Sequence, residues 1–379
     1  MKFDCDVKTL AKALGALVHV VPVRSGLPIL NHILLEAAED GLTLTATDLE
    51  FGARLRVPAE VAEPGATTVP ARLVADVVGA LKADRVTVAL KENRLRIGAS
   101  RSSTTLNVTE AEEFPPGPKP ADGEPITLPR EELLAAIEQV RPAVSTDSAR
   151  AVLTGVLLRF DGSHLVLTST DGLRLVERRM DGVMSRQEDA VVPLKALAEL
   201  GRAFKDETDD IELRFASARN EVFFRCGAAE VSSRLLAGQY PRYDEVIPKD
   251  ASTVVRADRA ELARAVRMVG VVSESASSRA LSLLIDAGGI RLIAQTPQVG
   301  ESEAEIEADV EGEAMWIALN SRFLLDGLAA ADVERVELRL NGSLAPVLVR
   351  GVGAKSCISV LMPIRLAVPP QLSARSEAA

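Results

Sequence analysis

The pentapeptide VPARL at residues 69–73 decides the fold of this chain, because two related pentapeptides follow it at nearly equal spacing. VPLKA begins 123 residues later, at 192–196, and LNSRF begins 127 residues after that, at 319–323. Proline is tolerated in the first turn of a helix, and Asn320 or Ser321 can cap one. Each pentapeptide therefore predicts the start of a helix, and the chain contains this element three times.

A second helix is predicted ahead of each of these starts. Apolar residues recur there at i, i+4 and i+7, the spacing that places them along one side of a helix. The three sets are Leu10, Leu14 and Leu17, then Leu133, Ile137 and Val140, and then Leu262, Val266 and Val269. A hydrophobic residue followed by proline ends each repeat, at 114–115, 240–241 and 362–363. These landmarks agree on a period of about 126 residues, longer than a solenoid repeat of ~20–50 residues and long enough for a domain.

Short apolar runs between the helices predict strands, and turns that contain glycine divide them. In the first repeat the runs are 33–37, 42–46, 53–57, 85–90, 94–97 and 103–108. We therefore predict an α+β fold of three repeated domains, each with two helices packed on antiparallel sheets. The predicted domains are 1–120, 121–246 and 247–366, with linkers at 113–125 and 240–250 and a disordered tail at 367–379.

Composition narrows the functional class. Aromatic residues make up only 3% of the chain, so its cores are aliphatic. The net charge of −10 argues against a uniformly basic, nonspecific nucleic-acid binder but allows a local basic face. Cys5, Cys226 and Cys357 lie far apart and form no metal-ligand spacing, which indicates free thiols in a reducing compartment. Without a signal peptide or a run of ~18 apolar residues, we expect a cytoplasmic protein with no membrane partner.

The sequence offers no convincing catalytic or cofactor-binding constellation. The histidines, His19, His32 and His164, form neither a metal-binding motif nor a helix-spaced pair. Residues 351–356 resemble a phosphate-binding loop, but Ala354 stands where that loop needs glycine, so a β-hairpin turn is favoured. No metal or other cofactor is expected.

Asp48 and Asp171 occupy equivalent positions in two repeats, each directly after a threonine. Paired catalytic carboxylates are one interpretation. Capping of two equivalent turns is favoured, because Asp side chains commonly bond to the backbone two residues on.

Several segments together resemble the beta subunit of bacterial DNA polymerase III, the sliding clamp. The resemblance covers residues 1–366 and rests on MKF at 1–3, LPIL at 27–30, TATDLE at 45–50, EPGATTVPAR at 63–72, TDGLRL at 170–175, YPRY at 240–243 and VLMPIRL at 360–366. It implies a head-to-tail homodimer that closes a ring of six domains, with helices lining the hole and sheets outside. Duplex DNA would pass through the hole without sequence recognition, and no reaction would be catalysed.

The resemblance also implies a peptide-binding pocket between the second and third domains. Its partners would be the DNA polymerase III alpha subunit, the clamp loader and other proteins that carry a short clamp-binding motif. The implied pocket residues are Leu153, Thr170, Gly172, Leu173, Arg174, Leu175, Pro241, Val246, Phe323, Val360, Met362, Pro363, Ile364 and Arg365.

Two further residue sets follow from the resemblance. Basic residues recur on equivalent helices and loops, and a closed ring would aim them at DNA phosphates: Arg24, Arg72, Arg141, Arg150, Lys195, Arg202 and Arg279. The implied dimer interface pairs Leu106 and Val108 with Val271 and Val272, and sets Arg96 and Arg101 opposite Glu301, Glu303 and Glu305.

The chain departs from the family at four places. Leu173 replaces a histidine and Phe323 a tyrosine seen in some members, so the implied pocket keeps its shape and loses polar groups. Ala-Val at 151–152 replaces an aromatic pair near DNA, and Arg150 beside it is the electrostatic substitute. The tail at 367–379 extends past the usual end near the pocket.

Two other functions remain open at this stage. A peptide-binding scaffold built from repeats, with no DNA inside, would bind peptides without being retained on circular DNA. A phosphate-ester hydrolase would show turnover that vanishes in Asp171→Ala, although no convergent set of catalytic residues supports it.

Overall fold

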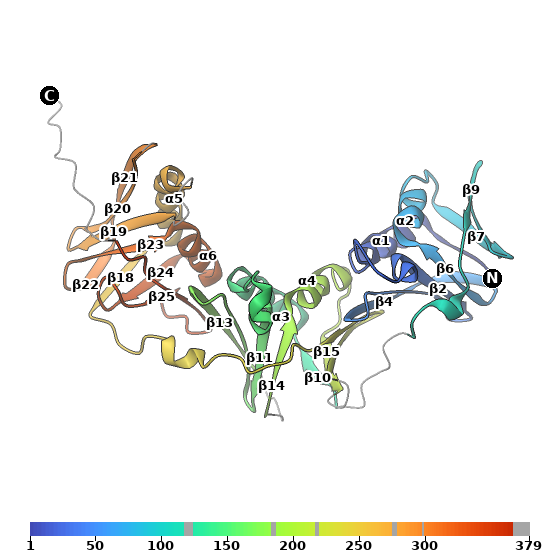
Figure 1. The fold of residues 1–379 in the computed structure, drawn as a ribbon, viewed down its shortest axis with the longest axis horizontal. Coiled ribbons are helices and arrows are strands. Elements are labelled where there is room, and N and C mark those ends of the chain that lie inside the picture. Colours follow the sequence, from blue (N-terminus) through green and yellow to red (C-terminus); the bar gives the residue numbers. More distant parts are fainter. Residues whose placement is uncertain (117–123, 183–186, 217–219, 275–278, 298, 367–379) are drawn as a thin grey trace. The chain divides into compact units, whose positions relative to one another are not determined.

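The structure is a computed structural model that describes residues 1–116, 124–182, 187–216, 220–274, 279–297 and 299–366. It divides into two compact units, residues 1–134 with 192–236 and residues 135–191 with 237–379 (Figure 1). The predicted linker residues 117–123 and the predicted tail at 367–379 lie outside the described residues. The predicted domain borders at 120 and 246 stay a prediction.

The first unit contains two sheets. One has five strands in the order β5 (Ala59–Glu63), β1 (Lys2–Asp6), β7 (Arg85–Lys91), β8 (Arg94–Ala99) and β9 (Ser102–Asn107). The other has eight strands in the order β10 (Ile126–Leu128), β15 (Ile211–Ala216), β16 (Glu221–Cys226), β17 (Ala229–Arg234), β4 (Phe51–Val57), β3 (Gly41–Thr47), β2 (His32–Ala38) and β6 (Gly65–Pro70). The six strands predicted for the first repeat are all present as β2, β3, β4, β7, β8 and β9, and β1, β5 and β6 of that repeat add to them.

The helices of the first unit lie on its eight-stranded sheet (Figure 1). They are α1 (Val7–Val18), α2 (Ala71–Gly79) and α4 (Leu194–Ala203). In α1 the predicted stripe of Leu10, Leu14 and Leu17 is buried. Burying a leucine side chain stabilises a fold by about 1.5–3 kcal/mol, so this stripe holds α1 on the sheet. The helix α3 (Arg130–Val140) runs across the border between the units.

The second unit also contains two sheets. One has nine strands in the order β14 (Gln187–Pro193), β11 (Gly155–Asp161), β12 (His164–Thr170), β13 (Arg174–Asp181), β26 (Cys357–Leu361), β25 (Val347–Gly351), β24 (Arg335–Leu340), β18 (Thr253–Asp258) and β22 (Asp309–Gly312). The other has four, β21 (Gly300–Ile306), β20 (Gly289–Thr296), β19 (Ala280–Asp286) and β23 (Met315–Asn320). The described pairings in both units are antiparallel, which confirms the predicted α+β class.

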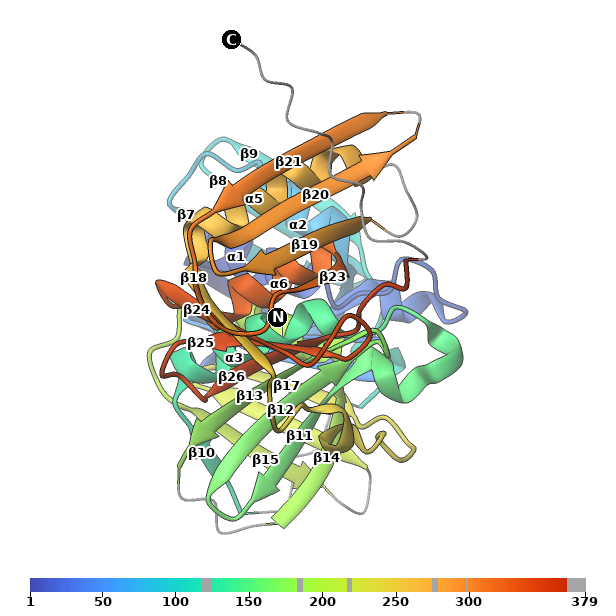
Figure 2. The same ribbon diagram turned by 90° about the vertical axis from the view of Figure 1, so that its left-hand side faces the viewer.

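Two helices build the core of the second unit with these sheets. The helix α5 (Arg259–Gly270) packs against β20 and β21, and α6 (Ser321–Ala331) packs against β25 and β26 (Figure 2). Leu262 and Val266 of α5 and Leu324 of α6 are fully buried in one aliphatic cluster. The predicted apolar spacing thus marks the face that enters the core.

Each large sheet joins strands from two successive repeats. In the first unit β17 pairs with β4, so that Val231 faces Ala53. In the second unit β26 pairs with β13, so that Ser359 faces Val176. Successive repeats therefore share a hydrogen-bonded sheet, in addition to being joined by the covalent chain.

Several local predictions can be compared with the structure. The segment 351–356 joins the antiparallel strands β25 and β26, which confirms the hairpin turn. Pro70 and Pro193 take the cap position before α2 and α4 rather than the first turn. The predicted linker 240–250 contains a short 3-10 helix at Tyr243–Val246, and the Tyr243 side chain is buried because it packs on the nine-stranded sheet.

The three cysteines are free, as predicted, and the structure buries all three. Burial raises the pKa of the Cys5 thiol to about 12 and that of Cys226 to about 11. Among the described residues, no group of His, Cys, Asp or Glu side chains is arranged to hold a metal ion. No helix within the described ranges is both long enough and apolar enough to span a membrane.

The start of α6 provides a test of the capping prediction. The Asn320 side-chain oxygen accepts hydrogen bonds from the backbone N–H groups of Arg322 (3.0 Å) and Phe323 (3.2 Å), so Asn320 is the cap. Asn320→Ala should lower the free energy of unfolding by about 1 kcal/mol, and Asn320→Asp should retain most of it. Urea unfolding of the three proteins measures this, and equal stability of parent and Ala variant would contradict the assignment.

Candidate functional site

A tight turn between β12 and β13 provides the floor of the candidate site. The Thr170 hydroxyl donates to the Arg174 carbonyl (2.7 Å) and accepts from the Gly172 N–H (3.0 Å). The Asp171 carboxylate accepts from the N–H groups of Leu173 (2.9 Å) and Arg174 (3.0 Å). Gly172 has a φ of +90°, which glycine adopts without steric cost. Asp171 therefore caps a turn, as the repeat predicted.

A cavity of about 280 Å³ opens above this turn in the second unit. Leu153, Leu175 and Val360 form its buried apolar walls, and half-exposed Val246 stands at its edge. The lining residues are Arg150, Leu153, Thr170, Gly172, Arg174, Leu175, Pro241, Arg242, Tyr243, Val246, Val360 and Met362. An apolar cavity with a few cationic groups can hold apolar side chains and orient a polar backbone beside them.

Arg174 fixes one wall of this cavity. Its guanidinium binds Asp171 (3.0 Å) and Asp326 of α6 (2.5 Å), and it also donates to the Pro142 carbonyl. Its central carbon lies 4.2 Å from the centre of the Phe323 ring. Only 11% of the Arg174 side chain is exposed, and its N–H groups donate to acceptors within the protein. The wall is therefore preorganised.

Tyr243 supports the cavity from the predicted linker. Arg159 donates to the Tyr243 hydroxyl (3.2 Å), and its guanidinium lies 5.1 Å from the ring centre. Burial raises the pKa of Tyr243 to about 12, so the phenol stays protonated at physiological pH. Burial also raises the pKa of Glu177, which a hydrogen bond from Tyr243 opposes. This polar cluster anchors the segment that carries Pro241 and Val246.

Nine of the fourteen predicted pocket residues line the cavity. The others surround it: Leu173 is exposed, Phe323 lies beside Arg174, and the segment 363–365, formed by Pro363, Ile364 and Arg365, follows Met362 at the end of β26. Sequence reasoning did not include Arg150, Arg242 and Tyr243. The YPRY segment that contains two of them was the available signal.

The predicted DNA-facing residues fall into three groups. Arg24 and Arg72 are exposed, and Arg279 is half-buried with a φ of +47°. Carboxylates lie beside the remaining four: Asp48 at Lys195, Glu138 at Arg141, Asp147 at Arg150 and Glu199 at Arg202. The structure also places Arg150 at the cavity, where it donates to the Asp171 carbonyl (3.0 Å).

Some cations of the first unit gather around one groove. A hollow of about 320 Å³ lies between α1, β4 and α4, and Lys8, Lys12, Arg56 and Arg202 line it. Asp206 pairs with Lys12 there. The groove is thus basic, with its charge moderated by acidic neighbours.

The predicted interface residues lie on or near two edge strands, β9 in the first unit and β21 in the second, and at the end of α5. At β9, Leu106 is buried and Val108 is half-buried, while Arg96 on β8 and Arg101 are exposed. On β21, Glu301, Glu303 and Glu305 are exposed in alternation, and Glu305 pairs with Arg291 (2.5 Å). Val271 is exposed and Val272 half-buried at the end of α5.

Comparison with known proteins identifies the class. Family models of the DNA polymerase III beta subunit match the chain in three parts: the N-terminal domain at 1–118, the central domain at 127–242 and the C-terminal domain at 244–365. The beta sliding clamp of Pseudomonas putida is 31% identical over 370 residues, 97% of this chain and all of that protein. The beta sliding clamp of Staphylococcus aureus is 29% identical over 376 residues, 96% of this chain and 99% of that protein.

Comparison with solved structures gives the same class. The DNA polymerase sliding clamp from Bacillus subtilis superposes with a TM-score of 0.93 at 25% identity, covering 97% of this chain and 99% of that one. The sliding clamp from Pseudomonas aeruginosa bound to griselimycin gives 0.92 at 29% identity, covering 97% and 100%.

The fold and these matches define a DNA-replication protein of three α+β domains. The chain belongs to the family of bacterial DNA polymerase III beta subunits. It is a DNA sliding clamp, a processivity factor of the polymerase and not an enzyme.

Replacing Arg174 tests whether its side chain stabilises the cavity wall. Arg174→Met should lower the free energy of unfolding by about 2–4 kcal/mol, because two carboxylates and a carbonyl lose their buried donor. Arg242→Met is the matched control, since Arg242 also lines the cavity but its side chain is 82% exposed. We expect the control to change stability by less than about 0.5 kcal/mol. Urea denaturation compares them, and equal midpoints would show that Arg174 does not hold the wall.

Proposed function

We propose that two copies of this chain close a head-to-tail ring of six domains around duplex DNA, and that the cavity above Gly172 binds short peptide motifs of replication proteins. The domains of each copy are 1–120, 121–246 and 247–366. The DNA polymerase III alpha subunit and the clamp loader are the partners we infer. The observation that carries the peptide site is the apolar cavity with its fixed Arg174 wall.

The size and lining of the cavity favour a linear motif as its ligand. Its volume of about 280 Å³ is just below the ~300–1,000 Å³ of typical ligand pockets and suits one or two apolar side chains. Arg150 and Arg242 can donate hydrogen bonds to the carbonyl or amide oxygens of a bound peptide. A small site of this kind gives modest affinity, which lets partners exchange.

The DNA contact that we infer is weak, because carboxylates lie beside most of the cations that would bind phosphate. Lys195, Arg202, Arg141 and Arg150 each have a carboxylate beside them, which competes with phosphate. Such cations supply a sequence-independent attraction that falls with salt. A closed ring retains DNA topologically, so strong phosphate binding is unnecessary and would slow sliding.

Complementary charge at two edge strands supports ring closure. Both β9 and β21 end their sheets, and an open edge can pair with another chain. Exposed Arg101 precedes the edge strand β9 and exposed Arg96 lies on the adjacent strand β8, while exposed Glu301 and Glu303 lie on the edge strand β21. A head-to-tail contact between such edges must close into a ring, since an open one would build filaments.

Closing the cavity tests the peptide site. Gly172→Arg places a long side chain where an added Cβ would meet the flexible end of Arg150. We expect a fluorescein-labelled Gln-Leu-Ser-Leu-Phe peptide to bind the parent and to bind this variant at least about 100-fold more weakly, ~2.7 kcal/mol, by fluorescence anisotropy.

Leu49→Arg is the matched control for that test. Leu49 is the repeat counterpart of Gly172 and has a φ of +78°, so a side chain is tolerated at this position of the turn. The control should bind like the parent. Unchanged binding in Gly172→Arg would remove the peptide assignment.

Reversing charge at one edge tests the ring. Glu301→Lys with Glu303→Lys should weaken the dimer about tenfold or more in sedimentation analysis and shorten retention on nicked circular DNA. Adding Arg96→Glu and Arg101→Glu to the same chain should restore both, because each junction regains opposite charges. A dimer that neither pair of substitutions weakens would place the interface elsewhere.

A further inference from the structure

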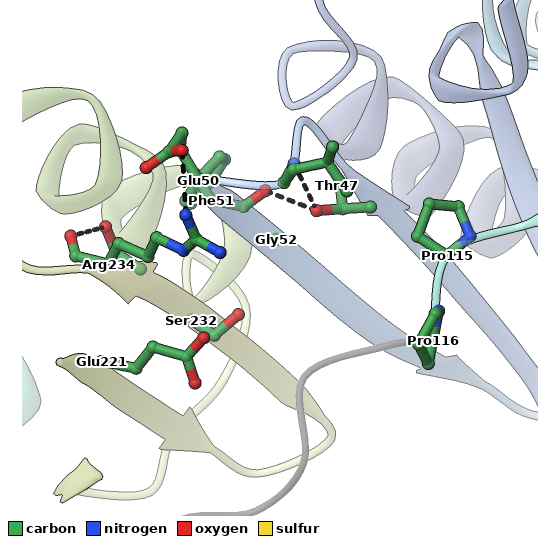
Figure 3. Close-up of a pocket in the computed structure, with 11 residues that line it drawn as sticks. Thr47, Glu50, Phe51, Gly52, Pro115, Pro116, Glu221, Ser232 and Arg234 are labelled. Atoms are coloured by element: carbon green, nitrogen blue, oxygen red, sulfur yellow. Dashed lines mark hydrogen bonds and ion pairs between the residues drawn. The ribbon is translucent and has the colours of Figure 1, made fainter. Parts of the chain in front are cut away.

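The cavity above Gly172, here the first cavity, has a counterpart in the first unit, here the second cavity. The second cavity also has a volume of about 280 Å³. Figure 3 shows Glu50 and Arg234 on one side of it and Pro115 and Pro116 on the other. Its lining residues are Thr47, Leu49, Glu50, Phe51, Gly52, Pro115, Pro116, Glu221, Ser232, Ser233 and Arg234.

The turns below the two cavities are the same, but the linings differ. Thr47 and Asp48 bond to the backbone of their turn as Thr170 and Asp171 do 123 residues later. Gly52, Ser232 and Arg234 stand where the first cavity has Leu175, Val360 and Met362. A feature that one cavity has and the other lacks is therefore a candidate for a role in the particular function of that cavity.

The strands that leave the two turns differ at one charged position. Glu177 on β13 faces Thr168 on β12, and the equivalent residue of the first unit, Arg54 on β4, faces Thr45 on β3. Arg54 approaches Glu230 of the neighbouring strand, with 4.0 Å between the charged groups. The second unit thus has a carboxylate where the first has a guanidinium that pairs within its own sheet.

Tyr243, in the 3-10 helix that follows Pro241, is a hydrogen-bond partner of Glu177. The Tyr243 phenol donates to the Glu177 carboxylate and accepts from Arg159 of β11 (3.2 Å). Arg159 also donates to Asp244, the next residue of the helix (3.4 Å). A carboxylate, a phenol and a guanidinium thus fasten this helix to the sheet.

Further charged and titratable groups surround Glu177. Arg179 on the same strand favours the ionised carboxyl, and Asp244 disfavours it. Cys357 approaches from β26, and burial raises the pKa of its thiol to about 12, so the thiol is neutral. Burial is the largest influence on Glu177 and raises its pKa above the ordinary 4.5, although the Tyr243 bond and the nearby arginines oppose it.

The ionised form of Glu177 therefore makes the fold less stable. Because its pKa is higher in the folded than in the unfolded chain, ionisation lowers the free energy of unfolding above the folded pKa, and this loss disappears as the pH falls below 4.5. A glutamine would avoid that loss and still accept a hydrogen bond. Stability thus does not explain why a carboxylate stands here.

Glu177 reaches the first cavity through Tyr243. Glu177 does not line the cavity, whereas Pro241, Tyr243 and Val246 do. The Tyr243 N–H donates to the Pro241 carbonyl (2.8 Å), so the phenol and the proline are parts of one folded segment. The Thr168 hydroxyl lies near the phenol and is buried without a hydrogen-bond partner among the described residues. It offers a second partner to a phenol that Glu177 has released.

We propose that ionised Glu177 is a positioning residue for peptide binding. Its bond to the Tyr243 phenol holds Pro241 and Val246 in the wall of the first cavity, and protonation releases the phenol to Thr168 and weakens peptide binding. A hydrogen bond to an ionised acceptor is about twice as strong as a neutral one, so the wall is preorganised in one protonation state and looser in the other. Peptide binding and proton release are thereby coupled, since each favours the ionised carboxyl. This inference rests on the proposed function, which makes the first cavity the peptide site.

The first test measures binding of the full-length protein to an amidated Gln-Leu-Ser-Leu-Phe peptide that carries tetramethylrhodamine, a label of constant charge in this range. We expect the affinity of the parent to fall at least about fivefold between about pH 7.5 and about pH 5. Glu177→Gln should bind at both pH values within about twofold of the weaker affinity of the parent. Tight binding by Glu177→Gln at the higher pH, or pH-independent binding by the parent, overturns the proposal.

Glu337→Gln is the matched control on the same sheet. Glu337 is buried, and Arg256 (3.0 Å) and Arg350 (2.6 Å) donate to its carboxylate. Burial acts to raise its pKa, but these bonds prevail and lower it, so ionised Glu337 stabilises the fold.

The two glutamine variants should therefore have opposite effects. Glu337→Gln should lower the urea midpoint and leave peptide affinity and its pH dependence within about twofold of the parent. Glu177→Gln should leave the midpoint at or above that of the parent and weaken binding. Equal weakening of binding by both variants, or a loss of stability in Glu177→Gln that accompanies its loss of binding, would show a merely structural role.

The two tyrosines of the chain, Tyr240 and Tyr243, provide a second pair of variants. Tyr243→Phe keeps the ring and removes the phenol oxygen, so it should weaken binding at least about fivefold at about pH 7.5 and abolish the pH dependence. The Tyr240 hydroxyl bonds to the Thr168 carbonyl instead (3.4 Å), and Tyr240→Phe should bind within about twofold of the parent. Equal affinities of the two variants would contradict the role of the Tyr243 phenol.

The absorption of Tyr243 reports on the bond itself. In Tyr240→Phe, Tyr243 is the remaining tyrosine, and its near-ultraviolet absorption should shift to shorter wavelength as the pH falls and the ionised acceptor is lost. Addition of Glu177→Gln should remove this shift. A shift that persists in the double variant, or its absence from Tyr240→Phe, overturns the proposal.

Failure of this inference is distinguishable from failure of the proposed function, because Gly172→Arg reports on the peptide site alone. If the probe binds the parent, loses affinity on Gly172→Arg and does not respond to Glu177→Gln, only the positioning role is wrong. If the probe binds the parent and Gly172→Arg equally, the peptide assignment is wrong and this inference falls with it.

Discussion

The pairing of strands from successive repeats is the constraint on which the rest of this structure depends. β17 pairs with β4 in the first unit and β26 with β13 in the second. Each pairing brings the last strand of one repeat against the Thr-Asp turn of another, and a cavity forms beside that turn. Because backbone hydrogen bonds make both junctions, the side chains around them are free to differ. The repeat therefore supplies two similar frames with different linings.

Much of the local structure was predictable from the sequence, because its signals are local. The stripe at Leu10, Leu14 and Leu17 marks the buried face of α1, and the repeated Thr-Asp pair marks two identical turns. Alternation along a strand reports which face is buried but not which strand lies beside it. The pairing of β4 with β17 was therefore out of reach, since the two are separated by more than a hundred residues.

The candidate site was predictable only in part, for the same reason. The residues taken from the resemblance are mainly wall and floor positions, and most of them line the cavity. Tyr243 was missed because it lies in a segment with no helical or strand period, although burial and Arg159 hold it in place. Arg150 was predicted to face DNA, and its place in the cavity lining was not foreseen, because a charged residue on a loop carries no sign of its direction. Its bond to the Asp171 carbonyl is a tertiary feature.

The two cavities show how a repeated frame can diverge in chemistry without losing its shape. In each Thr-Asp turn the Thr and Asp side chains form hydrogen bonds with the backbone of the turn itself. The turn therefore keeps its shape without contacts from the residues that line the cavity. Leu49 in one turn and Gly172 in the other both have positive φ, which shows that even this strained position accepts a side chain. Arg174 links one turn to α6 through Asp326, and in the counterpart turn Lys195 of α4 pairs with Asp48 and lies 5.5 Å from the centre of the Phe51 ring. Both turns are thus tied to equivalent helices, and what differs is the lining, which is apolar in the first cavity and more polar in the second.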